Sequence, residues 1–246
     1  MLTKEQEKQV KDILLMEIEK PSRGKFNIYI KNQKIHTTQI YRGSLDPDMS
    51  DIAVEFYKVI YEDVLDEECK DILNKSLLIN KDFCGDTMNS YNRISKNLTS
   101  DLKKKLNGQY HCLANFWLLP MHVGHGSPYT SKLGLSYYSK STFSDQIYDY
   151  MDRFINKFFI EINEYKRVYP NYTHIFTKNN FATKHFIDDI YIKNGKVLYF
   201  SNNDNADEVA NIMIDKINKR ADKLVKEKGP QLYKLFAEDL KLITKK

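Results

Sequence analysis

The chain is predicted to fold as a predominantly helical α+β protein, with about seven to nine helices and two β-hairpins around one core. Glycine (9 residues) and proline (6 residues) are scarce among the 246 residues, which disfavours a fold of many short strands and turns. Apolar residues recur at helical spacing along most of the chain, whereas alternation of apolar and polar residues is confined to two short stretches. The simplest organisation is a single α-rich globular domain over 1–200, with a helical C-terminal extension over 201–246 packed on it.

The N-terminal elements are predicted to be a helix and a hairpin. Thr3 and Gln6 have the spacing of a capping box, so the first helix is expected to begin there. Its apolar face includes Ile18, and it should end before Pro21, because proline does not continue a helix. Residues 26–41 alternate between apolar and polar side chains on both sides of a polar turn, which indicates a β-hairpin.

Several shorter elements are expected in the middle of the chain. A helix is predicted over 52–60, where apolar residues form one stripe, and a shorter one around 69–73. A third helix is expected to be capped at residue 86 or 87 and to end at Asn107-Gly108. The apolar run over 110–119 contains the only tryptophan of the chain and fits either a buried helix or a strand.

The C-terminal half is predicted to be mostly helical. The clearest amphipathic pattern covers 143–162 and indicates a long helix. A helical segment over 178–188 precedes a second hairpin over 190–200, because Asn194-Gly195 readily adopts the positive φ angles of a tight hairpin turn. The extension is predicted to form two helices separated by Gly229-Pro230.

Charge and cysteine content restrict the class of protein. The formal net charge of +5 suits a polyanionic partner, although the basic residues are dispersed along the chain. Cys69, Cys84 and Cys112 include no CxxC pair and no secretory leader is recognisable, so we expect a cytoplasmic protein with buried thiols. No window approaches the roughly 18 consecutive apolar residues of a membrane span, so no membrane partner is expected.

The strongest candidate site lies in the glycine-rich loop that follows the apolar run around Trp117. Glycines in this loop would let a ligand approach the backbone closely. His122 and His125 are the predicted catalytic residues, because an imidazole can transfer protons near neutral pH. Ser127 and Lys132 are predicted to bind substrate, since a hydroxyl, a cation and backbone N–H groups together suit a phosphate.

Residues outside this loop complete the predicted site. Arg93 is expected to bind phosphate together with the loop lysine, and Asn115 is expected to orient the loop. Arg42, at the end of a predicted strand, is a further substrate-binding candidate and resembles the strand arginine of ADP-ribosyltransferases, which holds the phosphates of the nicotinamide dinucleotide. The Ser-Thr-Ser and Glu-x-Glu motifs of that family have partial counterparts at 139–142 and 161–164.

Two further groups of residues leave alternatives open. The HxxH spacing over 122–125 could hold zinc together with His111 or Cys112, although no carboxylate lies close by in sequence. We therefore assign no metal. The polar residues of 184–189, which are a lysine, a histidine and two aspartates, are expected to form a helix end with solvated charges. The alternative is that Asp188 or Asp189 binds a metal or acts as a base.

Two resemblances bear on the family of the chain. The first is a resemblance to a family of bacterial proteins of uncharacterised function, and it extends over most of 40–195. The matching segments are Asp86-Thr87, Asn92-Arg93, Leu113–Pro120, the aromatic helix from Phe143, and Lys184–Asp189. This resemblance implies no known chemistry. The second is short: LANFWLLP is similar to the L-G-N-L-x-L-L segment of the His-Asn-His domain in modification-dependent restriction nucleases. It implies that Asn115 takes the position of the motif's asparagine. The catalytic histidine of that family lies well upstream in a His-x-x-Pro context, where this chain has none.

Two functions from different classes follow from these observations. The first is a cytoplasmic enzyme, of the kind found in phage-defence loci, that cleaves phosphodiester bonds of a nucleic acid or nucleotide with the loop over 122–132 as its site. The second is a non-catalytic interaction protein, in which Tyr129, Tyr137 and Tyr138 join basic residues on a binding surface. An ADP-ribosyltransferase-like activity is a third alternative. The sequence identifies neither a cofactor nor an oligomeric state.

Overall fold

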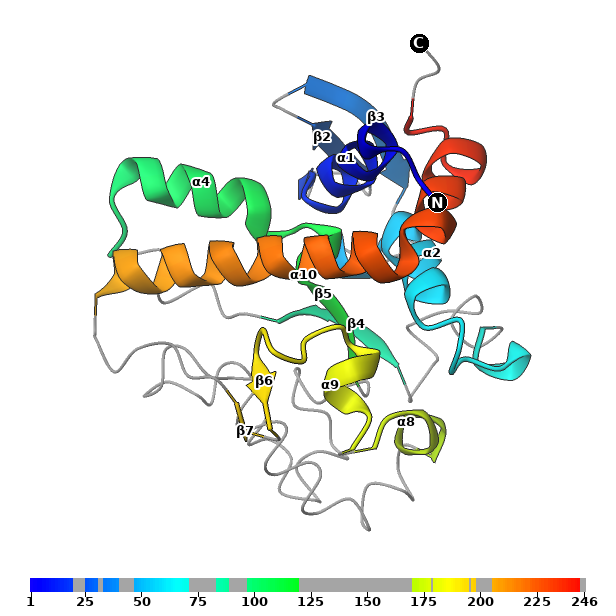
Figure 1. Ribbon diagram of the computed structural model, residues 1–246. Helices are drawn as coiled ribbons and strands as arrows, with labels where there is room; N and C mark the ends of the chain where they lie inside the picture. Colours follow the sequence, from blue (N-terminus) through cyan, green and yellow to red (C-terminus); the bar gives the residue numbers. More distant parts are fainter. Residues whose placement is uncertain are drawn as a thin grey trace.

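The computed structural model describes residues 1–19, 25–30, 33–39, 47–70, 83–88, 97–119, 170–177, 179–194, 196–197 and 205–243. Helices predominate in these segments, as predicted, and three small antiparallel sheets accompany them there. The long helix α10 (Ala206–Lys234) crosses the middle of the molecule (Figure 1). The N-terminal elements lie on one side of α10 and the elements of 170–197 on the other.

The N-terminal elements are α1 (Lys4–Leu14), β1 (Glu17–Glu19), β2 (Lys25–Ile30) and β3 (Gln33–Gln39). The capping box of α1 is confirmed, since both of its reciprocal side-chain-to-backbone hydrogen bonds are present. β2 and β3 form the predicted antiparallel hairpin. The helix nevertheless ends at Leu14, and Ile18 lies in β1 opposite Ile28 of β2. The longer helix was a wrong prediction, because pairing across the sheet outweighs the helical spacing of one apolar residue.

The next elements are η2 (Pro47–Met49), α2 (Asp51–Ile60), β4 (Cys84–Thr87) and β5 (Phe116–Leu119), and residues 67–70 are helical as well. α2 confirms the helix predicted over 52–60. β4 pairs with β5 in antiparallel register, so Asp86 and Thr87 lie in a strand and the predicted helix cap at these residues is wrong. The sheet approaches η2 so closely that a Cβ at Gly85 would lie 2.0 Å from the carbonyl oxygen of Asp48, which leaves room for glycine alone.

A helix and a short 3-10 turn lead into β5. They are α4 (Ser100–Tyr110) and η3 (Leu113–Asn115). The predicted end of the helix at Asn107-Gly108 is wrong, because α4 continues through these residues to Tyr110, which is buried as Leu106 is. The ambiguous run over 110–119 becomes the end of α4, then η3, then a strand, with Trp117 fully buried.

The elements that follow are α8 (Pro170–Ile175), α9 (Phe181–Lys184), β6 (Ile192–Lys193) and β7 (Lys196–Val197). The predicted second hairpin is confirmed, with Asn194 in its turn at a φ of 51°. α9 covers the centre of the helical segment predicted over 178–188. The predicted helix over 143–162 lies outside the described residues.

At the C-terminal end, α10 passes through Gly229-Pro230 as one helix and continues into the π-helical turn η5 (Leu235–Asp239). The prediction of two separate helices is therefore wrong. Figure 1 shows the last turns, in red, directed away from the orange part of α10. A proline inside a helix removes one hydrogen bond and bends the axis, so Pro230 accounts for the change of direction.

The core is built around α10. Its buried apolar face, which includes Met213, Ile217 and Leu224, belongs to one cluster with residues of α1, α2 and β5. The domain boundary near residue 200 stays a prediction. None of the described helices has the length and apolar character that a membrane span requires.

Candidate functional site

Most of the predicted site lies outside the described residues. This holds for the residues of the loop and for two arginines, which are His122, His125, Ser127, Lys132, Arg42 and Arg93. Their roles stay predictions. The structure does place Asn115, the remaining predicted site residue, together with the polar residues of 184–189.

Asn115 is fully buried at the end of η3. Its Nδ2 donates to the carbonyl oxygen of Tyr110 at 2.8 Å, and its own carbonyl oxygen accepts from the backbone N–H of Met88 at 2.9 Å. These bonds connect the end of α4, the turn before β5 and the end of β4. Asn115 thus has a structural role here, and its predicted effect on the loop after β5 remains untested.

Arg220, near the middle of α10, has no exposed surface. Its Nε donates to the carbonyl oxygen of His185 at 2.9 Å, and its Nη1 donates to those of Ala114 and Phe116, each at 2.8 Å. Burial lowers the pKa of Arg220 from its ordinary value, but a guanidinium remains charged in proteins. In the described part of the chain its partners are thus three carbonyl oxygens rather than a carboxylate.

His185 lies beside Arg220, in the turn after α9, and is also fully buried. Its Nδ1 is 2.6 Å from the hydroxyl oxygen of Tyr61, which accepts from the backbone N–H of Leu118 at 3.4 Å. One hydrogen bond joins the hydroxyl and Nδ1, and which of the two groups donates depends on the tautomer of the imidazole. Nε2 has no hydrogen-bond partner among the described residues. Burial, and secondarily the charge of Arg220, holds the pKa of His185 well below its ordinary value.

Aromatic rings enclose this histidine. The ring centroid of Phe176 lies 4.5 Å away at 21° to the imidazole plane, and that of Phe181 lies 4.3 Å away. The ring centroid of Trp117 lies 5.7 Å from that of the imidazole, and the two planes are inclined at 68°. No reactant reaches a histidine or an arginine that has no exposed surface. The buried polar network of Arg220, His185 and Tyr61 is therefore a structural centre, and the prediction that His185 belongs to a solvated helix end is wrong.

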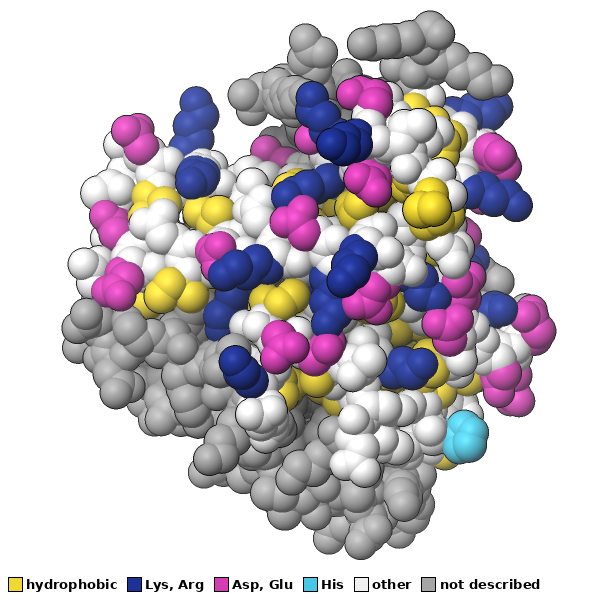
Figure 2. All heavy atoms as spheres, in the orientation of Figure 1, with side chains coloured by type: hydrophobic (Ala, Val, Ile, Leu, Met, Phe, Trp, Pro, Cys, Tyr) yellow, Lys and Arg dark blue, Asp and Glu magenta, His cyan; other side chains and the backbone are white. Residues whose placement is uncertain are grey.

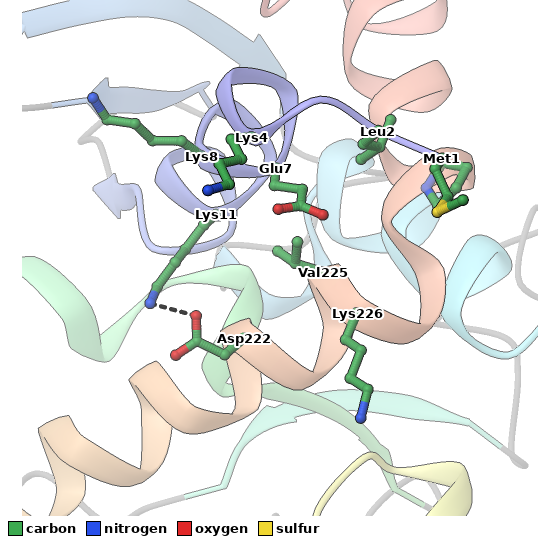
Figure 3. A pocket seen from close by; sticks show the side chains of 10 residues that line it. Met1, Leu2, Lys4, Glu7, Lys8, Lys11, Asp222, Val225 and Lys226 are labelled. Carbon is green, nitrogen blue, oxygen red and sulfur yellow. Dashed lines mark ion pairs between the residues drawn. The ribbon is translucent and has the colours of Figure 1, made fainter.

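An accessible candidate site lies elsewhere, between α1 and the C-terminal half of α10. A cavity of about 570 Å³ opens there (Figure 3). Its apolar lining comes from Leu2, Val225 and Pro230, together with Met1. Leu2 approaches Gly229 so closely that a Cβ there would lie 3.0 Å from Cδ1 of the leucine, so the absence of a side chain at this turn of α10 admits the N-terminal segment.

Charged residues flank this cavity from both helices: they are Lys4, Lys8, Lys11, Lys226, Glu7 and Asp222. We refer to the cavity and these residues as the lysine groove. Its four lysines exceed its two carboxylates by two charges. Three of the lysines follow the helical spacing i, i+4, i+7 on α1, a pattern that places them along one side of that helix. Figure 2 shows the face over α1 and α10, where dark blue basic side chains alternate with magenta acidic ones.

The described residues offer little for a metal. No group of three or more His, Cys, Asp or Glu side chains that could hold an ion occurs among them. Cys112, named as a possible zinc ligand from the sequence, is a buried free thiol. Burial raises its pKa to about 12, so the thiol stays protonated at neutral pH. The zinc alternative at 122–125 lies outside the described part of the chain.

Comparisons with known proteins identify neither a family nor a function for this chain. No protein-family model, no curated protein and no solved structure matches this chain. The two resemblances noted in the sequence therefore stay predictions.

Some of these features were visible in the sequence. The lysine spacing on α1 could have been noticed, and so could the position of Arg220 within the apolar stripe of Ile217 and Leu224, where a cation is unusual. The acceptors of Arg220 could not have been found in this way. They are backbone carbonyl oxygens, which every residue carries.

The buried imidazole predicts a pH dependence of stability. The pKa of His185 is near 6.5 in the unfolded chain and lower in the folded protein, so below pH 6.5 the unfolded state binds more protons. The free energy of unfolding should then fall as the pH falls below 6.5, by up to about 1.4 kcal/mol per pH unit, with no contribution above that pH. Urea unfolding at pH 7.5, 6.5 and 5.5 measures this dependence.

The variant His185→Asn isolates the effect, because all other titrating groups are shared with the wild type. The pH dependence below 6.5 should be shallower in His185→Asn by the amount given above. His174→Asn, which removes an exposed imidazole from α8, is the matched control and should keep the wild-type dependence. Equal pH dependence in the wild type and in His185→Asn would contradict the prediction.

Proposed function

We propose that this protein binds the phosphate backbone of nucleic acids in the lysine groove, without sequence preference. The observation that supports the proposal is the excess of lysines over carboxylates along an accessible groove between two helices. The net charge of +5 favours a polyanionic partner as well. The proposal assigns the nucleic-acid partner expected from the sequence to the surface of α1 and α10.

The chemistry of the groove favours backbone contacts over base contacts. A lysine ammonium is a compact point charge that attracts phosphate, but it lacks the planar fork with which arginine reads a guanine edge. None of the described residues that line the groove is aromatic, so stacking on unpaired bases contributes nothing there. The lysines of α1 follow each other at intervals of about 4.5–6 Å along the helix axis, which suits several phosphates of one strand. A duplex of arbitrary sequence is thus an adequate probe.

Removal of three groove lysines should weaken binding to such a duplex. We expect Lys4→Gln, Lys8→Gln and Lys226→Gln, combined in one variant, to lower the affinity by about tenfold or more at 100 mM salt, because each lysine contributes through released counterions. The slope of log K against log salt should become shallower by up to about 2.7, at about 0.9 for each lost contact. Fluorescence anisotropy of a labelled 20-base-pair DNA duplex over a salt series measures both quantities.

The lysine run of α4 supplies the matched control. Lys103, Lys104 and Lys105 are exposed and do not line the groove. Their combined substitution by glutamine removes the same charge from the protein. An equal loss of affinity in the control variant would show that net charge alone causes binding, and the lysine groove would then not be the site.

A catalytic step is the second part of the proposal, and it is supported by sequence alone. The loop over 122–132 combines two histidines with glycines, a serine and a lysine, which suits proton transfer at a bound phosphate. Phosphodiester cleavage of the kind expected of a phage-defence enzyme would then accompany binding. An interaction protein without catalysis is the alternative.

Glutamine at both His122 and His125 distinguishes these functions. The enzyme proposal predicts that the double variant loses cleavage of labelled DNA and RNA while its thermal unfolding midpoint stays at the wild-type value. A fall in the midpoint would mean that the histidines are structural. Binding without cleavage by the wild-type protein would favour the interaction protein.

A further inference from the structure

The lysine groove contains a counter-charge of its own. Nζ of Lys11 on α1 lies 2.5 Å from Oδ1 of Asp222 on α10, and Figure 3 shows the lysine reaching across to the aspartate. The two side chains keep 34% and 59% of their surface exposed, so a ligand can reach both. The other groove lysines form no ion pair with a described residue, which makes Lys11 the one whose charge is already engaged in the free protein.

A carboxylate fixed on the neighbouring helix competes with any phosphate for this lysine. Because Asp222 belongs to the same chain, it is present at Lys11 at a high effective concentration. A phosphate that approaches Lys11 has to displace the carboxylate and tolerate its negative charge nearby. A polyanion has an advantage here, since its other phosphates are held by the remaining lysines while the exchange takes place.

We propose that Asp222 is a built-in competitor that sets the affinity of the lysine groove, and that a bound nucleic-acid backbone displaces it from Lys11. The inference rests on the proposed function, because it concerns the regulation of the same site. Lys11 then has two alternative partners, the carboxylate in the free protein and a phosphate in the complex. Removal of the carboxylate should strengthen binding, and it should do so more strongly when Lys11 is present.

The experiment compares two aspartates of the same helix. Asp215 forms an exposed ion pair with Lys219 at 2.6 Å and does not line the groove. Asp222→Asn and Asp215→Asn therefore change the net charge of the protein equally. We expect Asp222→Asn to raise the affinity for the labelled 20-base-pair duplex by roughly two- to fivefold, the upper part of the range for an exposed ion pair. Asp215→Asn should change it by less than about 1.5-fold.

A second comparison separates displacement from simple repulsion. In the Lys11→Gln background there is no pair to break and only the repulsion remains, so Asp222→Asn should raise the affinity by less than it does when Lys11 is present. The thermal unfolding midpoint of each variant serves as the test of folding. Equal effects of the two aspartate variants, or an equal gain from Asp222→Asn with and without Lys11, would overturn the inference.

These outcomes are distinct from a failure of the proposed function. If the wild type binds the duplex and the triple lysine variant does not, the function stands whatever Asp222 does. If neither the wild type nor Asp222→Asn binds the duplex, the proposed function fails and the inference fails with it.

Discussion

The hydrogen bonds from the Arg220 guanidinium to three backbone carbonyl oxygens hold the structure together. A fixed charge without exposed surface costs several kcal/mol unless its donors find acceptors, whereas each hydrogen bond from a charged group returns about 1.5–3 kcal/mol. The acceptors belong to η3, to β5 and to the turn at His185. The burial of this one side chain is therefore favourable only when α10, β5 and the turn after α9 assemble together.

The same helix holds a strained turn on one side and the lysine groove on the other. Phe186 and Asp189 have φ angles of 58° and 60°, a region that costs about 1–3 kcal/mol for a residue other than glycine. Arg220 secures one end of this turn, and an ion pair from α10 secures the aspartate at 188. Asp222 lies about 200° around the helix from Arg220, which places the two side chains on nearly opposite sides of α10. Because the Arg220 side is buried, the side with Asp222 and the lysine groove faces solvent.

The sequence predicted correctly those elements that are determined by residues close together in the chain. α2 and both hairpins were predictable because an apolar stripe, alternation and an Asn-Gly turn determine them. Predictions failed where distant partners decide: Ile18 joins a strand because β2 pairs with it, and α10 continues through Pro230 because its residues pack into the core on both sides. The spacing of the lysines on α1 predicts part of the charge of the lysine groove. It does not predict that the groove lies between α1 and α10. Arg220 shows most clearly what local patterns cannot predict, since two of its acceptors, at Ala114 and Phe116, lie about a hundred positions before it in the sequence.

The free energy of unfolding of Arg220→Met tests the central role of this side chain most directly. Methionine keeps the unbranched apolar stem but removes every donor, so three carbonyl oxygens lose their partner while the cost of the buried charge disappears. Since the unsatisfied carbonyl groups cost about 1–3 kcal/mol each, the account predicts a net loss of about 3 kcal/mol or more in urea unfolding at pH 7.5. A variant as stable as the wild type, or more stable, would contradict it.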